Sequence, residues 1–150
     1  MHVEVTIVLA SSADREELLE LLGAQLEEHA IDVATESLAR AVDGVFADPE
    51  RGRFLVARLE GTAVGVAYLS YLWTLEHGGK SAWLDELYVV PARRERGVGR
   101  ELLRAACDRA ARDGCAAVDL EVEASHARAA RLYAREGFRP HQRARWVRVL

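Results

Sequence analysis

One segment restricts what this 150-residue chain can fold into more than any other. An apolar strand, residues 87–90, runs through Pro91 into an arginine-rich turn that contains Gly97 and Gly99. Beyond the turn, apolar residues recur at helical spacing at positions 98, 102, 106 and 110. Glycine lets the backbone approach a ligand closely, and the first N–H groups of a helix lack internal acceptors. The segment is therefore predicted to bind a phosphate-like anion where the helix begins.

The spacing of these glycines distinguishes between kinds of phosphate-binding loop. No third glycine follows at the dinucleotide-binding spacing, and no Gly-Lys-Ser/Thr follows as in a P-loop. Arg94-x-x-Gly97-x-Gly99 instead resembles the pyrophosphate-binding motif of the GNAT superfamily of N-acetyltransferases. Residues 120–138, which end in Leu-Tyr-x-x-x-Gly-Phe, resemble the strand-and-helix motif that follows it in that family. With both motifs in order, the resemblance covers about residues 54–150 well and the first part of the chain more loosely.

The resemblance implies a fold and a cosubstrate. The fold would be a single α+β domain over residues 1–150, with a mixed, mostly antiparallel sheet and about four flanking helices. Its two parallel strands would splay apart where acetyl-CoA binds, and a homodimer is expected from the family alone. The main chain of Tyr88, Val89 and Val90 would hold the pantetheine arm. The turn would hold the pyrophosphate through Arg94, Glu95, Arg96, Gly97, Val98, Gly99 and Arg100.

Local patterns predict the order of the elements. Ser11 or Ser12 can cap a first helix, and Glu60-Gly61 between two apolar runs predicts a hairpin. A hairpin followed by β-α-β-α-β predicts an α+β domain whose parallel crossover is right-handed. The expected strands are 3–9, 54–59, 64–69, 82–90, 116–122 and 143–150, and the expected helices are 11–30, 35–46, one from 98, and 126–135.

Charge narrows the class of partner. The net charge is −4, but residues 93–112 hold seven arginines and three acids, a local +4 that leaves −8 for the rest of the chain. We expect this segment to meet phosphates, although a solvated helix face would give the same arginines. Because the chain is acidic overall and no aromatics interleave the basic segment, nucleic acid is not an expected partner.

Two further patterns bear on location and on metals. The first residues carry no basic region followed by an apolar run, and no stretch approaches a membrane span, so a cytoplasmic protein without a membrane partner is expected. Cys107 and Cys115 make a poor disulfide framework. No Cys/His cluster has zinc-ligand spacing, so no metal is expected.

Acetyl transfer to an amine needs a neutral nucleophile, a polarised thioester carbonyl and a proton for the departing thiolate. Tyr133 stands where the family places a phenol near the sulfur of CoA, which makes it the candidate general acid; packing beside Leu132 and Phe138 is the alternative. A backbone N–H near Val89 would polarise the carbonyl. His126 replaces an asparagine common in the family, and either holds the pantetheine or begins a helix at the surface.

Three acids compete for the role of general base. Asp85 and Glu86 are adjacent on the strand before the turn, so alternation predicts that they point to opposite faces. Glu121 lies on the neighbouring strand, where some protein-acetylating members of the family use a glutamate through water. Water molecules alone are the remaining possibility.

The acceptor is expected to be a small cationic amine. Residues 71–89, with an aromatic-Leu-acid-acid sequence at 83–86, resemble the diamine and polyamine N-acetyltransferases. The alternatives are a protein acetyltransferase acting on an N-terminus or lysine, and a non-catalytic acyl-CoA-binding module, which Tyr133 argues against. Residues that could extend a negative rim or offer cation–π faces to a cation, if they are not simply solvated or in the core, are Glu27, Glu28, Asp32, Tyr71, Trp73 and Trp83.

Overall fold

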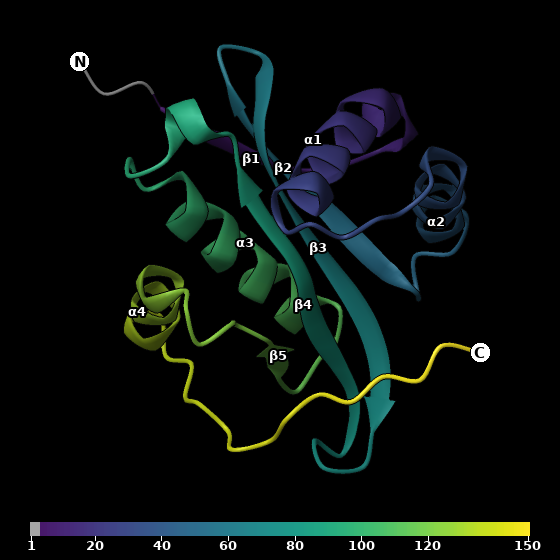
Figure 1. Cartoon of the computed structure of the whole chain (residues 1–150), viewed down its shortest axis with the longest axis vertical. Helices are drawn as coiled ribbons and strands as arrows, with labels where there is room; N and C mark the ends of the chain where they lie inside the picture. The colour runs from purple at the N-terminus through teal and green to yellow at the C-terminus, as the bar shows by residue number, and fades with distance from the viewer. Residues whose placement is uncertain (1–3) are drawn as a thin grey trace.

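The computed structural model describes residues 4–150 and shows an α+β fold in which helices cover both faces of one sheet (Figure 1). Residue 3 of the expected first strand lies outside the described residues. The strands are β1 (Thr6–Leu9), β2 (Gly52–Leu59), β3 (Thr62–Thr74), β4 (Gly79–Val89) and β5 (Val118–Leu120). The helices are α1 (Arg15–Glu28), α2 (Thr35–Ala47), α3 (Val98–Arg112) and α4 (Ala127–Arg135), with short 3-10 turns η1 (Ser12–Asp14) and η2 (Pro91–Arg93).

The sheet is mixed and its strands lie in chain order, β1-β2-β3-β4-β5. The first four strands pair antiparallel, and β5 pairs parallel to β4 after the crossover through α3. The turn between β2 and β3 has positive φ at both Glu60 (49°) and Gly61 (81°), as a two-residue hairpin requires. The predicted fold class is therefore confirmed, parallel pair included.

Local sequence explains where the helices begin and which side they bury. The side chain of Ser11 accepts a hydrogen bond from the N–H of Ala13, and the carboxylate of Asp14 accepts one from the N–H of Ser11. This capping box lies where the sequence predicts the start of the first helix. Helix α1 buries Leu18, Leu21, Leu22 and Gln25, and α3 buries Val98, Leu102, Leu103, Ala106 and Ala110. Both sets follow the three-to-four-residue spacing of one helix face.

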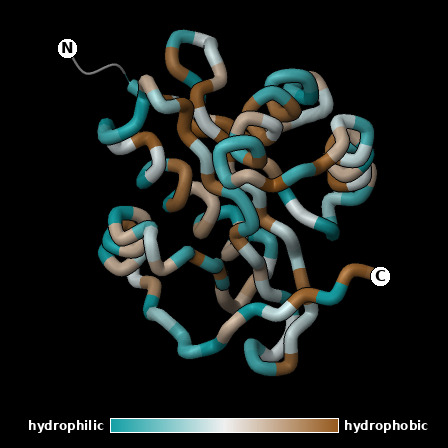
Figure 2. The backbone as a smooth tube through the Cα atoms, viewed as in Figure 1, coloured by the Kyte–Doolittle hydropathy of each residue, from teal (hydrophilic) through white to brown (hydrophobic). Residues whose placement is uncertain are grey.

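Two apolar cores result, one on each face of the sheet. Helices α1 and α2 pack on the face that includes Val56, Val66 and Tyr88, and α3 and α4 pack on the face that includes Leu69 and Leu84. Figure 2 shows hydrophobic residues along the central strands and hydrophilic residues in most turns and at helix ends. The two faces of β4 therefore belong to two different environments.

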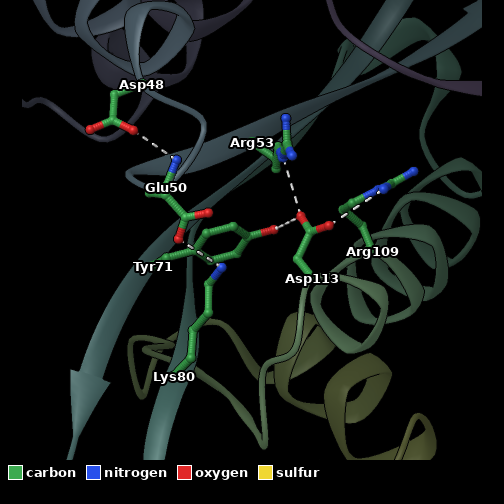
Figure 3. A network of polar contacts seen from close by, with 7 residues as sticks. All are labelled: Asp48, Glu50, Arg53, Tyr71, Lys80, Arg109 and Asp113. Carbon is green, nitrogen blue, oxygen red and sulfur yellow. Dashed lines mark hydrogen bonds and ion pairs between the residues drawn. The ribbon is translucent and has the colours of Figure 1, made fainter.

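A polar network fastens the C-terminal end of α3 to β2 and β3 (Figure 3). Asp113 accepts from the hydroxyl of Tyr71 at 2.5 Å and from Arg53 at 3.1 Å, and Arg109 lies 3.5 Å away. Burial alone would raise the pKa of Asp113, but the hydrogen bonds from Tyr71 and Arg53 hold that pKa below its usual value. The network anchors the end of α3 remote from the glycine turn.

The expected strand at residues 143–150 is wrong: this segment is extended but pairs with no strand. Its neighbour β5 has three residues where seven were expected, which is too short an edge to template another strand. Ion pairs from Arg143 to Glu76 and from Arg145 to Glu121 hold the segment instead. Trp146 is 92% exposed as a result.

Among residues 4–150, no helix is both long enough and apolar enough to cross a membrane.

Candidate active site

The site begins where β4 and β5 part. The two strands pair only through Ala82–Leu84 and Val118–Leu120, after which β4 continues to Val89 while β5 ends. Beyond Leu84, the edge of β4 that faced β5 has no strand beside it. An extended ligand can therefore add to this edge through main-chain hydrogen bonds, as a further strand would.

Backbone direction decides which residues face this open edge. The N–H of Val90 donates to the carbonyl of Val64 at 2.9 Å, so position 90 bonds towards β3. In an antiparallel pair, residues whose backbone groups bond to the partner strand alternate with residues whose backbone groups point away from it. The backbone groups of Tyr88 therefore also point towards β3, whereas the N–H of Val89 points to the open edge of β4. The expected contribution of Tyr88 and Val90 to a pantetheine site is therefore corrected. Val89, as expected, and Leu87, which was not among the expected site residues, have their backbone groups on the open edge of β4.

The glycine turn forms a concave set of backbone amides. Glu95 (φ 66°) and Gly97 (φ 84°) both have left-handed backbone on either side of Arg96, a combination that gathers successive N–H groups around an anion. The first helical bond of α3 runs from the N–H of Glu101 to the carbonyl of Gly97, and no side chain caps the helix. The N–H groups of residues 98–100 thus lack intrahelical acceptors. We call residues 95–100 the amide nest.

The arginines around the nest are mostly engaged within the chain. Arg94 donates to the carbonyl of Val89 at 2.8 Å and pairs with both carboxylate oxygens of Glu28 at 2.7 and 2.9 Å. Arg100 pairs with Glu136 at 2.7 Å. Arg96 is exposed and makes no ion pair within the described chain. Internal carboxylates therefore neutralise Arg94 and Arg100, whereas the N–H groups of residues 98–100 keep no intrahelical acceptor.

Asp85 and Glu86 lie on the same face of β4, which corrects the expectation that they point to opposite faces. The register with β3 shifts by one residue here: Tyr68 pairs with Glu86, and Leu69 pairs with Leu84. Leu84 and Leu87 both pack against the core on the α3 side, although they are three residues apart. The bulge between them leaves both acids on the side of α1 and α2.

This position changes the acidity of both groups. Burial, reinforced by the nearby carboxylate of Asp85, raises the pKa of Glu86 from 4.5 to about 7. Burial also raises the pKa of Asp85, and a hydrogen bond with Ser70 acts in the opposite direction. Adjacent acids with raised pKa values at an open strand edge are suited to bind a cation and to take up a proton.

Glu121 lies close enough to Asp85 for its charge to contribute to the raised pKa of Asp85. The structure therefore brings the three candidate bases together at the parting of the strands. Glu121 also pairs with Arg145 at 3.5 Å, so part of its charge is neutralised.

Tyr133 lies on the other side of the sheet. It packs against the core on the α3 side, with its ring 5.9 Å from that of Phe138 in an edge-to-face contact, and burial raises its pKa. Its hydroxyl donates to no group within residues 4–150. The packing beside Phe138 is therefore observed, the O–H has no acceptor among residues 4–150, and the role of Tyr133 as general acid stays a prediction.

His126 is the residue before α4, and its side chain makes no capping hydrogen bond there. Its ring lies 5.6 Å from that of His29, which follows α1. Arg128, in the first turn of α4, pairs with Glu95 of the nest. The start of α4 thus contacts both α1 and the nest, and a role for His126 in holding pantetheine stays a prediction.

Some of the residues expected to attract an amine are occupied. Lys80 lies 4.6 Å from the ring centre of Tyr71, so an internal cation already uses this aromatic face. Glu28 is paired with Arg94. Trp73 is 79% exposed. Tyr71 and Glu28 are therefore already engaged within the chain.

Sequence analysis missed Gln25. It is 6% exposed on the buried face of α1, and its side-chain oxygen has no hydrogen-bond partner among residues 4–150. The signal was present, because Gln25 falls three residues beyond Leu22 and seven beyond Leu18 in an otherwise apolar stripe.

Comparison with known proteins agrees with this geometry. The model of the acetyltransferase (GNAT) family matches residues 16–138. A search of curated proteins finds no match. Among solved structures, an integron cassette protein from the mobile metagenome of Cole Harbour Salt Marsh is 22% identical with a TM-score of 0.85, covering 96% of this chain and 90% of that one.

Two structures of acetyltransferases are also similar. An aminoglycoside N-acetyltransferase in complex with CoA is 17% identical, with a TM-score of 0.84, covering 99% of this chain and 97% of that one. A ribosomal-protein-alanine N-acetyltransferase from Brucella melitensis biovar Abortus 2308 is 20% identical, with a TM-score of 0.74, covering 97% of this chain and 100% of that one. At these identities the structures show a shared fold.

Proposed function

Because the chain belongs to the GNAT acetyltransferase family, we propose that it transfers the acetyl group of acetyl-CoA to a small cationic amine by direct attack in a ternary complex. The observation that carries the acceptor class is the pair of carboxyl groups of Asp85 and Glu86 on one face of β4, where it leaves β5. Carboxylates in such a place attract and partly desolvate a cation.

The residues around the parted strands fit acetyl-CoA as cosubstrate. The amide nest offers unsatisfied N–H groups to the pyrophosphate, and the exposed Arg96 adds a cation beside it. The free edge of β4 at Leu87 offers hydrogen bonds to the amide-bearing pantetheine arm, which leaves the N–H of Val89 for the thioester carbonyl. The nest and this edge are joined by η2 and therefore serve one continuous ligand.

The chemistry divides between the two faces of the sheet. Glu86, whose pKa is about 7, takes a proton from the ammonium group at neutral pH, and Asp85 keeps a second charge near the amine. The amine nitrogen then bonds to the thioester carbon as the carbon–sulfur bond breaks. Tyr133 gives its proton to the departing sulfur, and the resulting phenolate takes up the proton that the acylated nitrogen must lose. The N–H of Val89 polarises the carbonyl. Glu121 is the alternative base.

An acceptor panel read by release of the CoA thiol tests this function. Diamines should give the highest kcat/KM, ahead of monoamines and of peptides with free N-termini. Asp85→Asn should raise KM for the diamine by about tenfold, because a charge contact worth roughly 1.4 kcal/mol is lost, while acetyl-CoA binding stays unchanged. Added salt should likewise raise KM for the diamine in the wild type, because salt screens the attraction between the carboxylates and the cation.

The panel also separates the competing functions. A wide preference for peptides would replace the small amine with a protein acceptor. Binding of acetyl-CoA without turnover on any acceptor would indicate a non-catalytic acyl-CoA-binding module. The exposed Glu20 on α1 supplies a control, since Glu20→Gln removes one charge away from β4 and should leave KM unaltered. A single domain over 1–150, cytoplasmic localisation and a homodimer stay predictions.

A further inference from the structure

Three potential metal ligands meet at the opposite end of β4 from the amide nest. Glu76 and His77 lie in the turn between β3 and β4, and Asp119 is the middle residue of β5. One ligand atom from each residue lies within 4.8 Å of the other two. The group combines an imidazole with two carboxylates, and is therefore chemically distinct from a patch of acids.

The distances suit a small ion that is bound by all three groups. Nε2 of His77 lies 2.8 Å from Oδ2 of Asp119 and 3.7 Å from Oε1 of Glu76. Around a tetrahedral Zn²⁺ with bonds of about 2.0–2.2 Å, ligand atoms stand roughly 3.3–3.5 Å apart. The distance between His77 and Asp119 must therefore increase by about half an ångström, and that between His77 and Glu76 must decrease by a few tenths. Rotation of the side chains allows both changes.

One of the three ligands lies on a paired strand, and the other two lie in the turn between paired strands. Asp119 is held in the parallel pairing with Trp83, and the turn that carries Glu76 and His77 joins the two longest strands. The side chains of His77 and Asp119 are 24% and 31% exposed and that of Glu76 is 46% exposed, so the group is reachable from solvent. Water can complete the coordination.

One cation of the chain already occupies part of this group. Arg143, in the extended C-terminal segment, pairs with Oε2 of Glu76 at 2.9 Å and lowers the pKa of that carboxyl through this hydrogen bond. This single positive charge faces two carboxylates. A divalent ion would balance both charges, and Arg143 competes with it for Glu76.

We propose that Glu76, His77 and Asp119 bind a divalent transition-metal ion of the Zn²⁺ type. The ion would fasten the turn between β3 and β4 to β5. The eleven residues of β4 separate this turn from the amide nest, or roughly 33–36 Å of extended chain. The ion is therefore structural, takes no part in acetyl transfer, and is independent of the acceptor.

Calorimetric titration of the full chain with Zn²⁺, after removal of metals by a chelator, tests the proposal. One ion should bind per chain. His77→Ala and Asp119→Asn should each weaken binding by at least tenfold, and Arg143→Ala should strengthen it because Glu76 is released. His29→Ala is the matched control: it removes a histidine at the far end of the fold, and binding should not change.

Co²⁺ absorption distinguishes this site from the cysteines. Ligands from His77 and the two carboxylates give visible bands without the near-ultraviolet band of thiolate coordination. That thiolate band, the absence of saturable binding, or equal affinity in wild type and His77→Ala would each overturn the proposal. If His77→Ala does not fold, the isosteric Asp119→Asn decides. Zn²⁺ should also raise the unfolding midpoint of wild type and not of Asp119→Asn.

Discussion

At the scale of residues, the carboxyl group of Glu86 lies half-buried beside Asp85, and this surrounding raises its pKa to about 7. Between pH of about 4.5 and 7 the folded protein keeps a proton that the unfolded chain has released. Stability therefore falls as the pH rises through this window. A site that binds cations or transfers protons requires such a group, although the group lowers the stability of the folded protein.

Glu86→Gln should remove this pH dependence. The free energy of unfolding of the variant, relative to wild type, should increase by on the order of 2–3 kcal/mol from pH 4 to pH 8. Chemical denaturation at both pH values measures the change. Glu20→Gln, an exposed control, should show no such increase. Parallel stability curves for wild type and Glu86→Gln would mean that Glu86 ionises as an ordinary surface glutamate.

Tyr133→Phe keeps the edge-to-face contact with Phe138 and removes only the O–H. If the hydroxyl protonates the departing thiolate, kcat should fall by about 10²-fold, with KM for acetyl-CoA little changed. Stability should barely change, because the hydroxyl donates to no group in the described chain. Steady-state kinetics with the best acceptor of the panel measures the effect. A variant with nearly full kcat would leave Tyr133 as a packing residue.

At the scale of elements, β4 organises the site. Its bulge turns two adjacent acids to one face, its separation from β5 frees a backbone edge, and its C-terminal end leads into the amide nest. These features hold their positions only if α3 stays fixed against the sheet. The network around Asp113 supplies that attachment at the far end of the helix.

Tyr71→Phe tests the attachment. It removes the hydroxyl donor to Asp113 and should destabilise the fold by about 1–3 kcal/mol near pH 7. Because the pKa of Asp113 is held low, this stabilisation is present above the ordinary pKa of aspartate and is lost as pH falls below it. The difference from wild type should therefore shrink towards pH 3. Tyr68→Phe, on the same strand, is the control, and an equal loss in both variants would contradict the assignment.

At the scale of the whole molecule, local signals predicted most elements correctly. The capped first helix, the Glu60-Gly61 hairpin and the helix after the glycine turn depend on neighbouring residues, and each formed as expected. The bulge at Asp85 could not be predicted, because it is defined by the register of β4 against β3. The absence of a strand at 143–150 likewise depends on the short edge of β5.

The ion-pair partners of the site's arginines could not be predicted either, because they lie far away in the sequence. The sequence has a local +4 over residues 93–112, but the partners of Arg94 and Arg100 are Glu28 and Glu136, far along the chain in both directions. His77 and Asp119 meet only through the parallel pairing of β4 and β5. A search of sequence spacing alone therefore finds no metal ligands here.

Calorimetric titration of Gly97→Glu with acetyl-CoA tests directly whether the amide nest binds the pyrophosphate of this cosubstrate. A Cβ at Gly97 meets nothing within 4 Å, so the fold should survive, although φ of 84° adds some strain. Gly114→Glu at the other end of α3 has the same open surroundings and a φ of 89°, and is the matched control. We expect an affinity loss of more than about tenfold, or 1.4 kcal/mol, for Gly97→Glu only. Equal acetyl-CoA affinity in wild type and a folded Gly97→Glu would contradict it.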